Sequence, residues 1–353
     1  MNPVKHGGEA EAASSAVAFI SVVMPVRNEA LFIADTLRAL VSQDYPPDRM
    51  EILVVDGQSD DGTQAIVREF ASSYGKVKML DNPKRWSSAA RNIGVRNSTG
   101  QIITIVDGHC DIPGNQYLTN LAKAFSESGA DIVGRPQSLS VENATPVQQA
   151  IAIARASRLG HHPDSFIYSS ESQFVPAASV GTAYRREVFE RIGFFDEAFD
   201  ACEDVDFNTR ADRAGEKCFF TKDVEIRYYP RATLRGLFGQ LTRYGRGRVR
   251  LARKHPNTAS LKTFLPGLFV AGLLIGPLAA AFHSVLALAF IAVVVTYVLI
   301  VTATSGWLAI CNRKLGQWWR LQLVFATVHV GAGWGILKEF IVGRTRPRQS
   351  PDA

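Results

Sequence analysis

The residues that could do chemistry are carboxylates and one histidine that follow apolar runs of strand length. In "IVDGHCD" (105–111), Asp107 and His109 could share a divalent cation, and His109 stands where an aspartate would complete an Asp-x-Asp pair. Imidazole binds Mg²⁺ poorly and Mn²⁺ acceptably, so this substitution favours Mn²⁺ and leaves Mg²⁺ possible. His109 could instead donate to a phosphate or simply end a strand, and Asp111 could contribute to the cation site.

A further carboxylate could act as a general base. Asp204 lies in "CEDVDF" (202–207), and a carboxylate beside an acceptor hydroxyl can remove its proton during a displacement. Aspartate is also favoured at helix N-caps, so Asp204 could have a purely structural role at a helix start.

A sheet must position these residues, because apolar runs alternate with helical periodicity in this part of the chain. The runs are "AFISVVMP" (18–25), "EILVVDG" (51–57), "KVKML" (76–80) and "QIITIVDG" (101–108). The first helix has an apolar face of Leu31, Ile33, Leu37, Leu40 and Val41, and the next two begin near Asp61 and Ser87. This alternation predicts an α/β domain with a parallel, doubly wound sheet.

In such a sheet, ligands bind beyond the carboxyl ends of the strands, here the loops 25–30, 56–63 and 107–111. Each loop alone could be ordinary turn and capping chemistry. Three polar loops at one sheet edge favour a binding site. Further along, residues 179–199 predict a strand, a short helix and a loop, and residues 202–215 predict a helix that ends at a glycine.

Charge and apolar composition separate an acidic domain from a basic, apolar end. Residues 1–230 hold 23 Lys and Arg against 31 Asp and Glu, whereas residues 231–262, the collar, hold nine basic residues and no acid. Two uncharged apolar runs follow at 264–282 and 285–303, each long enough to cross a bilayer at ~1.5 Å per residue. A third run, 321–340, is less apolar and could span, lie in the interface or pack against the first two.

The predicted organisation is therefore a membrane-anchored catalytic domain on the cytoplasmic side of the inner membrane. The N-terminal tail has no apolar signal core. The basic residues of the collar and of 313–320 obey the positive-inside rule for a multi-pass protein whose large domain is cytoplasmic. The arginines after the third run do not fit this rule if that run spans, so either the run re-enters or the tail breaks the rule. Four cysteines without CxxC spacing predict a reducing compartment and no structural zinc. The predicted parts are a disordered tail (1–17), a catalytic domain (18–230), the collar (231–262), two to three transmembrane helices (263–342) and a basic tail (343–353).

Five motifs resemble, in order and spacing, those of family 2 glycosyltransferases, which are inverting enzymes with the GT-A fold. They are "VVMPVRNEA", "VVDGQSDDGT", "AARNIGVRNSTGQIITIVDG", "VGTAYRREVFERIGFFDEAF" and "EDVDF". The resemblance covers about residues 19–250 and is specific because all five fall in sequence. The strongest likeness is to bacterial exopolysaccharide glycosyltransferases of the succinoglycan, ExoA-like kind, which share the "VDGH" variant, a similar collar and a C-terminal membrane segment.

The resemblance implies a nucleotide-diphospho sugar as donor. It implies a divalent cation, preferably Mn²⁺, at Asp107 and His109, and Asp204 as the general base. Asp56 would accept the imide N–H of a uracil, and its alternative role is that of a turn residue. Arg91 could approach the phosphates or form a surface ion pair. The residues implied to bind the donor are Pro25, Arg27, Glu29, Asp56, Arg91 and Asp107.

The resemblance also implies an acceptor side, formed by Gly181, Thr182 and Glu203 together with residues of the collar. Gln240, Arg243 and Tyr244 resemble the QxxRW signature of membrane polysaccharide synthases, with Tyr in place of Trp. A Tyr ring can stack on an acceptor sugar with less area. These three residues could instead contact only lipid headgroups. Two or three membrane runs are too few for a processive export channel.

We therefore expect an inverting hexosyltransferase that moves a sugar from UDP-glucose or a similar donor to a lipid-linked saccharide. Its expected setting is exopolysaccharide biosynthesis, among membrane lipids and other polysaccharide-assembly proteins. The alternatives are a polyprenyl-phosphate glycosyltransferase and an inactive membrane scaffold that still binds sugar nucleotides. Nucleic acid is not an expected partner, because the collar adjoins membrane segments and lacks interleaved aromatic residues for base stacking.

Overall fold

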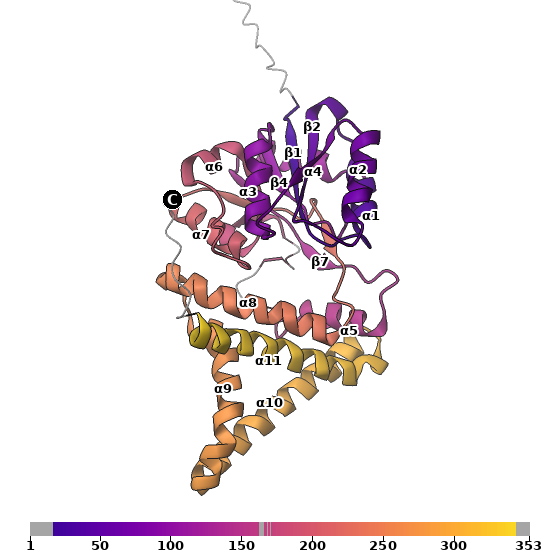
Figure 1. Cartoon of the computed structure of the whole chain (residues 1–353). Helices are drawn as coiled ribbons and strands as arrows, with labels where there is room; N and C mark the ends of the chain where they lie inside the picture. Colours follow the sequence, from indigo (N-terminus) through magenta and orange to yellow (C-terminus); the bar gives the residue numbers. More distant parts are fainter. Residues whose placement is uncertain (1–16, 162–165, 168, 170, 344–353) are drawn as a thin grey trace, which may run out of the picture.

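The computed structural model describes residues 17–161, 166–167, 169 and 171–343, so the two predicted tails lie almost wholly outside the described residues. An eight-stranded sheet with the order β3-β2-β1-β4-β9-β6-β10-β8 forms the centre of the first domain (Figure 1). Its strands are β1 (Ile20–Val26), β2 (Met50–Asp56), β3 (Val77–Asp81), β4 (Ile102–Ile105), β6 (Ile132–Gly134), β8 (Gln173–Val175), β9 (Gly181–Arg185) and β10 (Cys218–Phe220).

The four predicted strands, β1 to β4, pair in parallel, which confirms the predicted α/β sheet. Beyond them the sheet is mixed, because β9 runs antiparallel to both β4 and β6. A second sheet lies beside the carboxyl end of β4 and has the order β5-β11-β7. Its strands are β5 (Cys110–Asp111), β7 (Gln137–Leu139) and β11 (Ile226–Tyr228).

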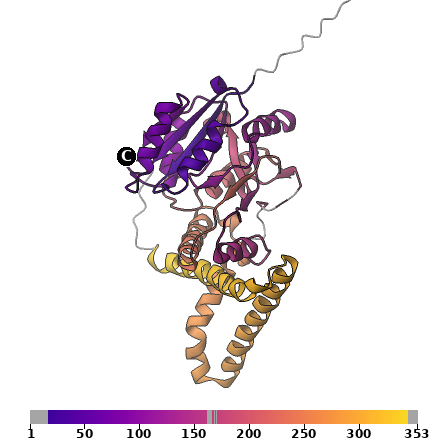
Figure 2. The same ribbon diagram turned by 90° about the vertical axis from the view of Figure 1, so that its right-hand side faces the viewer.

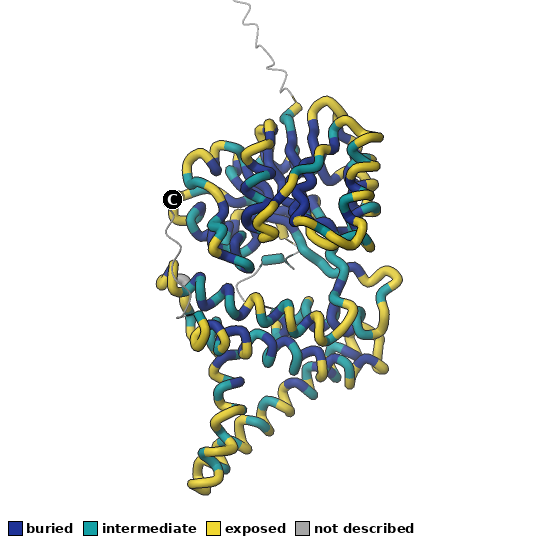
Figure 3. The backbone as a smooth tube through the Cα atoms, in the orientation of Figure 1, coloured by how far each residue is buried: buried dark blue, intermediate teal, exposed yellow. Residues whose placement is uncertain are grey.

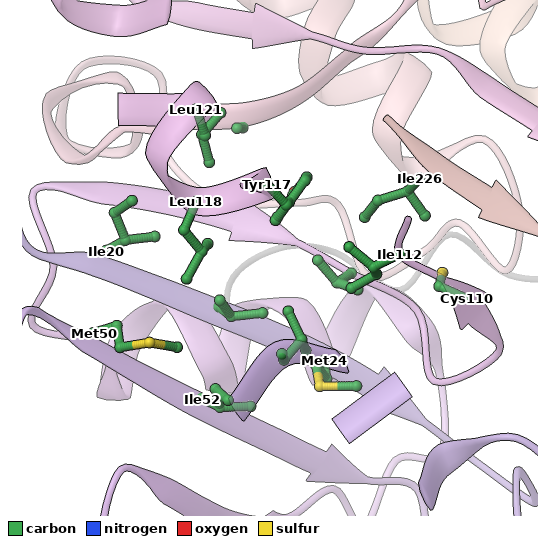
Figure 4. Packing of buried hydrophobic residues seen from close by; sticks show 14 of the residues in the cluster. Ile20, Met24, Met50, Ile52, Cys110, Ile112, Tyr117, Leu118, Leu121 and Ile226 are labelled. Atoms are coloured by element: carbon green, nitrogen blue, oxygen red, sulfur yellow. The ribbon is translucent and has the colours of Figure 1, made fainter. Parts of the chain in front are cut away.

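Alternating residues of the strands pack against helices on the two faces of the main sheet. Ile20, Met24 and Ile52 face α1, α2 and α4 (Figure 4), whereas Val23 and Leu53 face α3, α6 and α7. Helix α1 begins later than predicted, so Leu31 is 86% exposed and its predicted place in the apolar face is wrong. The helices are α1 (Ile33–Val41), α2 (Thr63–Ser73), α3 (Ser87–Asn97), α4 (Tyr117–Ser128), α5 (Pro146–Arg155), α6 (Arg186–Ile192) and α7 (Glu203–Ala214).

Four longer helices form the C-terminal part of the molecule. Helices α8 (Leu234–Lys254) and α11 (Trp318–Val342) lie side by side beneath the sheet domain, and the hairpin of α9 (Leu261–Phe282) and α10 (Ser284–Cys311) projects away from them (Figures 1 and 2). A Cβ atom added to Gly335 of α11 would lie 2.1 Å from the carbonyl oxygen of Thr242 on α8. The glycine therefore allows the two backbones to approach closely.

The hairpin has the properties of a membrane anchor. Of the helices in the described residues, α9 and α10 are the two that are long and apolar enough to cross a bilayer, and their side chains are mostly exposed (Figure 3). The third predicted run, α11, is not among these two helices. It packs along α8 and α5 through buried residues that include Leu321, Val324 and Phe325.

Candidate active site

The loops after β1 and β2 are joined to each other by hydrogen bonds. The amide of Asn28 donates to Ser59 Oγ (2.8 Å), and the amide of Glu29 donates to Thr63 Oγ1 (2.8 Å). Because β1 and β2 are parallel neighbours, their polar loops meet at one sheet edge, as expected. The side chains that follow the two strands are therefore held in a fixed relation.

Asp56 ends β2 and is fully buried. Its Oδ2 accepts hydrogen bonds from the Ser59 amide (3.0 Å) and from Gln64 Nε2 (2.7 Å), whereas its Oδ1 has no hydrogen-bond partner among the described residues. Pro25 and Arg27 lie on either side of the β1 residue that pairs with Asp56, Pro25 buried and Arg27 exposed. A buried carboxylate oxygen without a donor is available to an N–H group of a ligand.

His109 points toward the loop that follows β1. Its Nδ1 donates to Glu29 Oε1 (2.9 Å), so Glu29, which is also expected beside the nucleoside, holds the imidazole. Burial lowers the pKa of His109, but the hydrogen bond to Glu29 and the charge of Asp107 outweigh burial and raise the pKa above its usual value. The Nε2 atom is therefore the ring nitrogen left for a ligand.

The possible metal ligands Asp107 and His109 suit a cation that also takes ligands from a nucleotide. Among the described residues, no three His, Cys, Asp or Glu side chains are grouped to hold a metal ion by themselves. Asp111 lies in β5 opposite Arg227 and does not complete such a group with Asp107 and His109. The pair still fits, because a nucleotide-bound cation commonly takes one or two protein ligands, and a carboxylate such as Glu29 typically orients a ligating histidine.

The site has two parts: the loops after β1, β2 and β4, called the donor half, and the start of α7 with α8, called the acceptor half. Arg91, on α3, connects these two halves. Its side chain is 12% exposed, its Nη2 lies 3.3 Å from Glu203 Oε1, and its guanidinium covers the ring of Phe195. Burial alone would lower the pKa of Arg91, but nearby carboxylates raise it above its usual value. In order of effect these are Glu203, Asp204 and Asp107. Arg91 thus pairs inside the protein and not at the surface, with charges of both halves around it.

Asp204 is the second residue of α7 and is half-buried. The residue at the N-cap is Cys202, in a left-handed conformation with φ 65°, so the alternative that Asp204 caps the helix is wrong. Asp204 Oδ1 accepts a hydrogen bond from the amide of Val205 (2.8 Å). Glu203, predicted on the acceptor side, is the buried partner of Arg91, and burial raises its pKa while Arg91 opposes that shift.

Gly181 and Thr182 begin β9. Because β9 is antiparallel to β4, they lie beside the carboxyl end of β4, from which Asp107 follows. The carbonyl oxygen of Gly181 accepts hydrogen bonds from Asn208 Nδ2 (2.9 Å) and Tyr184 Oη (3.1 Å). The structure thus brings both residues to the sheet edge that holds the donor loops.

The predicted collar residues lie on α8, which passes beside the N-terminus of α7. Gln240 Nε2 donates to Tyr244 Oη (3.1 Å), and Arg243 is exposed. Cys202 Sγ lies 4.0 Å from the carbonyl oxygen of Tyr244. Tyr244 is 41% exposed. Partial desolvation of its phenol is the largest cause that raises its pKa, and the charge of Asp204 raises it further.

Two residues near the donor half escaped the sequence analysis. Arg135 is 1% exposed; its Nη2 donates to the Ile105 carbonyl (3.0 Å), and its Nε and Nη1 have no partner among the described residues. The ring of Tyr228 meets that of His109 edge-on, and burial and the charge of Asp107 raise the pKa of Tyr228. Arg135 directly follows β6, so the rule of polar residues after buried strands could have found it, whereas Tyr228 carried no such signal.

Comparisons with known proteins identify the family and the fold. Residues 21–193 match the family described as glycosyl transferase family 2. Glycosyltransferase AglE of Haloferax volcanii is 32% identical over 67% of this chain and 75% of its own length. Succinoglycan biosynthesis protein ExoA of Rhizobium meliloti is 32% identical over 73% of this chain and 77% of its own. The structure of mannosyltransferase PcManGT from Pyrobaculum calidifontis, in complex with GDP-Man and Mn²⁺, shares the fold, with TM-score 0.56, 22% identity, and coverage of 91% of this chain and 88% of that chain.

Proposed function

This chain belongs to glycosyltransferase family 2, and we propose that it is a membrane-anchored, inverting enzyme that transfers a sugar from a UDP-linked donor to a lipid-linked saccharide. One observation carries the proposal. The guanidinium of Arg91 lies 3.3 Å from Glu203 at the start of α7, and the charges of Asp204 beside it and of Asp107 after β4 also raise the pKa of Arg91. A leaving group held at Asp107 and a base at Asp204 then serve one reacting centre.

Asp204 supplies the proton chemistry. Its Oδ1 is engaged by the Val205 amide, so its other oxygen faces the acceptor and takes the proton of the attacking hydroxyl. The hydroxyl oxygen forms a bond to the anomeric carbon as the bond from that carbon to the diphosphate breaks. One displacement with one base inverts the configuration at the anomeric carbon.

Asp56, Asp107 and His109 hold the donor. Asp56 Oδ1, buried and without a partner among the described residues, accepts the imide N–H of uracil. Asp107 and His109 Nε2 would hold a divalent cation, preferably Mn²⁺, which would stabilise the negative charge of the leaving diphosphate. Glu29 fixes the orientation of the imidazole.

The C-terminal helices support a lipid-linked acceptor. The exposed apolar hairpin α9–α10 follows the basic helix α8 directly, which suits insertion from the cytoplasmic side with α8 and α11 at the headgroups. Exopolysaccharide assembly is the proposed setting because a relative that is 32% identical over 73% of this chain is a succinoglycan biosynthesis protein.

The test is a screen of nucleotide sugars with membranes containing the protein, with and without Mn²⁺, followed by linkage analysis of the lipid-linked product. Asp204→Asn is expected to lower turnover by about 10²–10⁴-fold without changing UDP affinity. Asp223→Asn, an exposed turn aspartate, serves as the control and should leave turnover unchanged. A sugar phosphomonoester product would favour a polyprenyl-phosphate transferase instead, and unchanged turnover in Asp204→Asn would contradict the catalytic assignment.

A further inference from the structure

The positive charges of α8 lie on two faces with different surroundings. Arg246 Nε and Arg250 Nε each lie 2.9 Å from the carboxylate of Glu339 on α11, and Arg250 also binds Asp200 (2.6 Å). These charges are neutralised inside the protein. Arg248 is half-buried, and no described residue forms a hydrogen bond or ion pair with it. A partly buried guanidinium without a carboxylate is suited to an anionic ligand.

Arg248 extends the row of predicted acceptor residues by one helical turn. Gln240, Tyr244 and Arg248 follow at intervals of four residues and therefore share a face of α8. Beside this row, Gly247 packs against the start of α7, where an added Cβ would lie 2.7 Å from Cys202 Sγ. The row thus passes the end of α7 that carries the predicted base.

Arg155 is the last residue of α5, a helix that packs against α11, the neighbour of α8. Its Nη1 donates to the carbonyl of Gly160, and no described carboxylate forms an ion pair with it. Burial raises the pKa of Tyr244, and the charge of Arg155 opposes that shift. Burial raises the pKa of Cys202 to about 12, and the charge of Arg248 opposes it. Both guanidinium groups therefore act on residues next to the start of α7.

This position is at the height of the membrane surface if the hairpin inserts. Helix α8 ends at Lys254 and α9 begins at Leu261, so the row lies close to the point where the chain enters the apolar hairpin. Figures 1 and 2 show α11 at the base of the hairpin, with α8 packed along α11 on the side of the sheet domain. A prenyl chain buried in hydrocarbon holds its phosphate at this interface. Guanidinium groups bind phosphate with two parallel hydrogen bonds.

We propose that Arg248 and Arg155 bind the phosphate that joins the acceptor saccharide to its lipid. The inference rests on the proposed lipid-linked acceptor and names the residues that recognise it. The donor diphosphate has the same chemistry, but the proposed function assigns it to Asp107 and His109. Binding of the lipid phosphate here leaves the saccharide to extend toward Asp204.

The test measures the affinity of the full chain, in detergent micelles, for geranylgeranyl diphosphate, geranylgeraniol and UDP. Arg248→Gln and Arg155→Gln are each expected to weaken geranylgeranyl diphosphate binding about tenfold, because a charge-assisted hydrogen bond to phosphate is lost. Arg248→Lys should recover part of the affinity. UDP affinity should be unchanged in all variants, which also shows that they are folded. Arg235→Gln removes an equal charge from an exposed position of α8 and should change none of the three affinities.

Three results would overturn the inference. Equal loss of UDP affinity in Arg248→Gln and Arg155→Gln would assign these arginines to the donor. Unchanged geranylgeranyl diphosphate affinity in both variants, or equal affinity of the wild type for geranylgeraniol, would remove the phosphate site. An equal loss in Arg235→Gln would indicate unspecific charge attraction. The proposed function fails separately: the expected binding pattern in a protein that transfers no sugar would contradict the function and retain the site.

Discussion

The donor half and the acceptor half of the site are held in place by different means. In the donor half, hydrogen bonds of backbone amides, such as that from Asn28 to Ser59, join loops that leave adjacent parallel strands, and the carboxylate of Glu29 holds His109. In the acceptor half, ion pairs join helices that are far apart in sequence, as between Arg91 and Glu203 and between Arg250 and Glu339. The donor half therefore depends on the sheet, and the acceptor half on how α3, α7, α8 and α11 pack.

This difference teaches where each half is vulnerable. A change in the donor loops should alter nucleotide and cation binding while the fold persists, because the strands beneath are fully buried. A change in a buried charge of the acceptor half should alter stability or turnover and spare the nucleotide, because an unpaired buried charge is costly.

The largest expected effect is that of Arg91→Met. It leaves the buried Glu203 carboxylate without its cation, which should lower the free energy of unfolding by about 3–5 kcal/mol. Unfolding in detergent measures this loss. The double variant Arg91→Met with Glu203→Gln should recover much of the stability but not the turnover. A single variant as stable as the wild type would show that ion pairs do not hold the acceptor half.

His109 tests the cation in the donor half. His109→Ala should weaken Mn²⁺-dependent UDP binding about 10–100-fold, because the imidazole ligand is lost and the fold is not. His109→Asp should retain activity and improve the use of Mg²⁺ relative to Mn²⁺, because a carboxylate suits Mg²⁺ better. Titrations with each metal and with EDTA measure both. Unchanged metal dependence in both variants would make His109 only the end of a strand.

Asp56 tests recognition of the base. Asp56→Asn replaces a carboxylate that can accept a uracil N–H, so the preference for UDP over CDP should narrow roughly tenfold. Competition binding of the two nucleotides gives the ratio, and Asp60→Asn, on the exposed loop nearby, is the control. A preference that survives in Asp56→Asn would assign base recognition to another group.

The smallest expected effect is that of Glu339→Gln on α11. This change weakens the contacts of Arg246 and Arg250, and Arg250 in turn holds Asp200 in the loop before α7. Turnover should fall roughly threefold with UDP affinity unchanged. Lys338→Gln, at the neighbouring exposed position, is the control. If UDP affinity falls together with turnover, the two halves are less independent than the contacts indicate.

The donor half was largely predictable because its signals are local. Four apolar runs became β1 to β4, and the rule for parallel sheets led to Asp56 and Asp107 at their carboxyl ends. The helix expected at 202–215 is α7, closed by Gly215. Even here the sequence did not show that Glu29 would hold His109, since that contact joins residues 80 positions apart.

The acceptor half was less predictable because its partners are remote. Arg91 meets Glu203 across more than a hundred residues, and neither neighbourhood indicates the other. The sequence left three placements open for residues 321–340, and the packing of Gly335 against Thr242 puts α11 along α8. The alternative that Asp204 caps the helix is wrong because Cys202, in the left-handed conformation, occupies the N-cap position.

The sequence by itself determined the α/β class, the glycosyltransferase family and two apolar runs of membrane-spanning length, because these follow from local periodicity, motif order and composition. Only the tertiary structure decided which charges are neutralised within the protein and which remain available. On α8, Arg250 and Arg248 are two residues apart, yet the first is bound by Asp200 and Glu339 and the second by no described residue. The physical reason is that successive helical side chains point to different neighbours, and packing decides which neighbours are present.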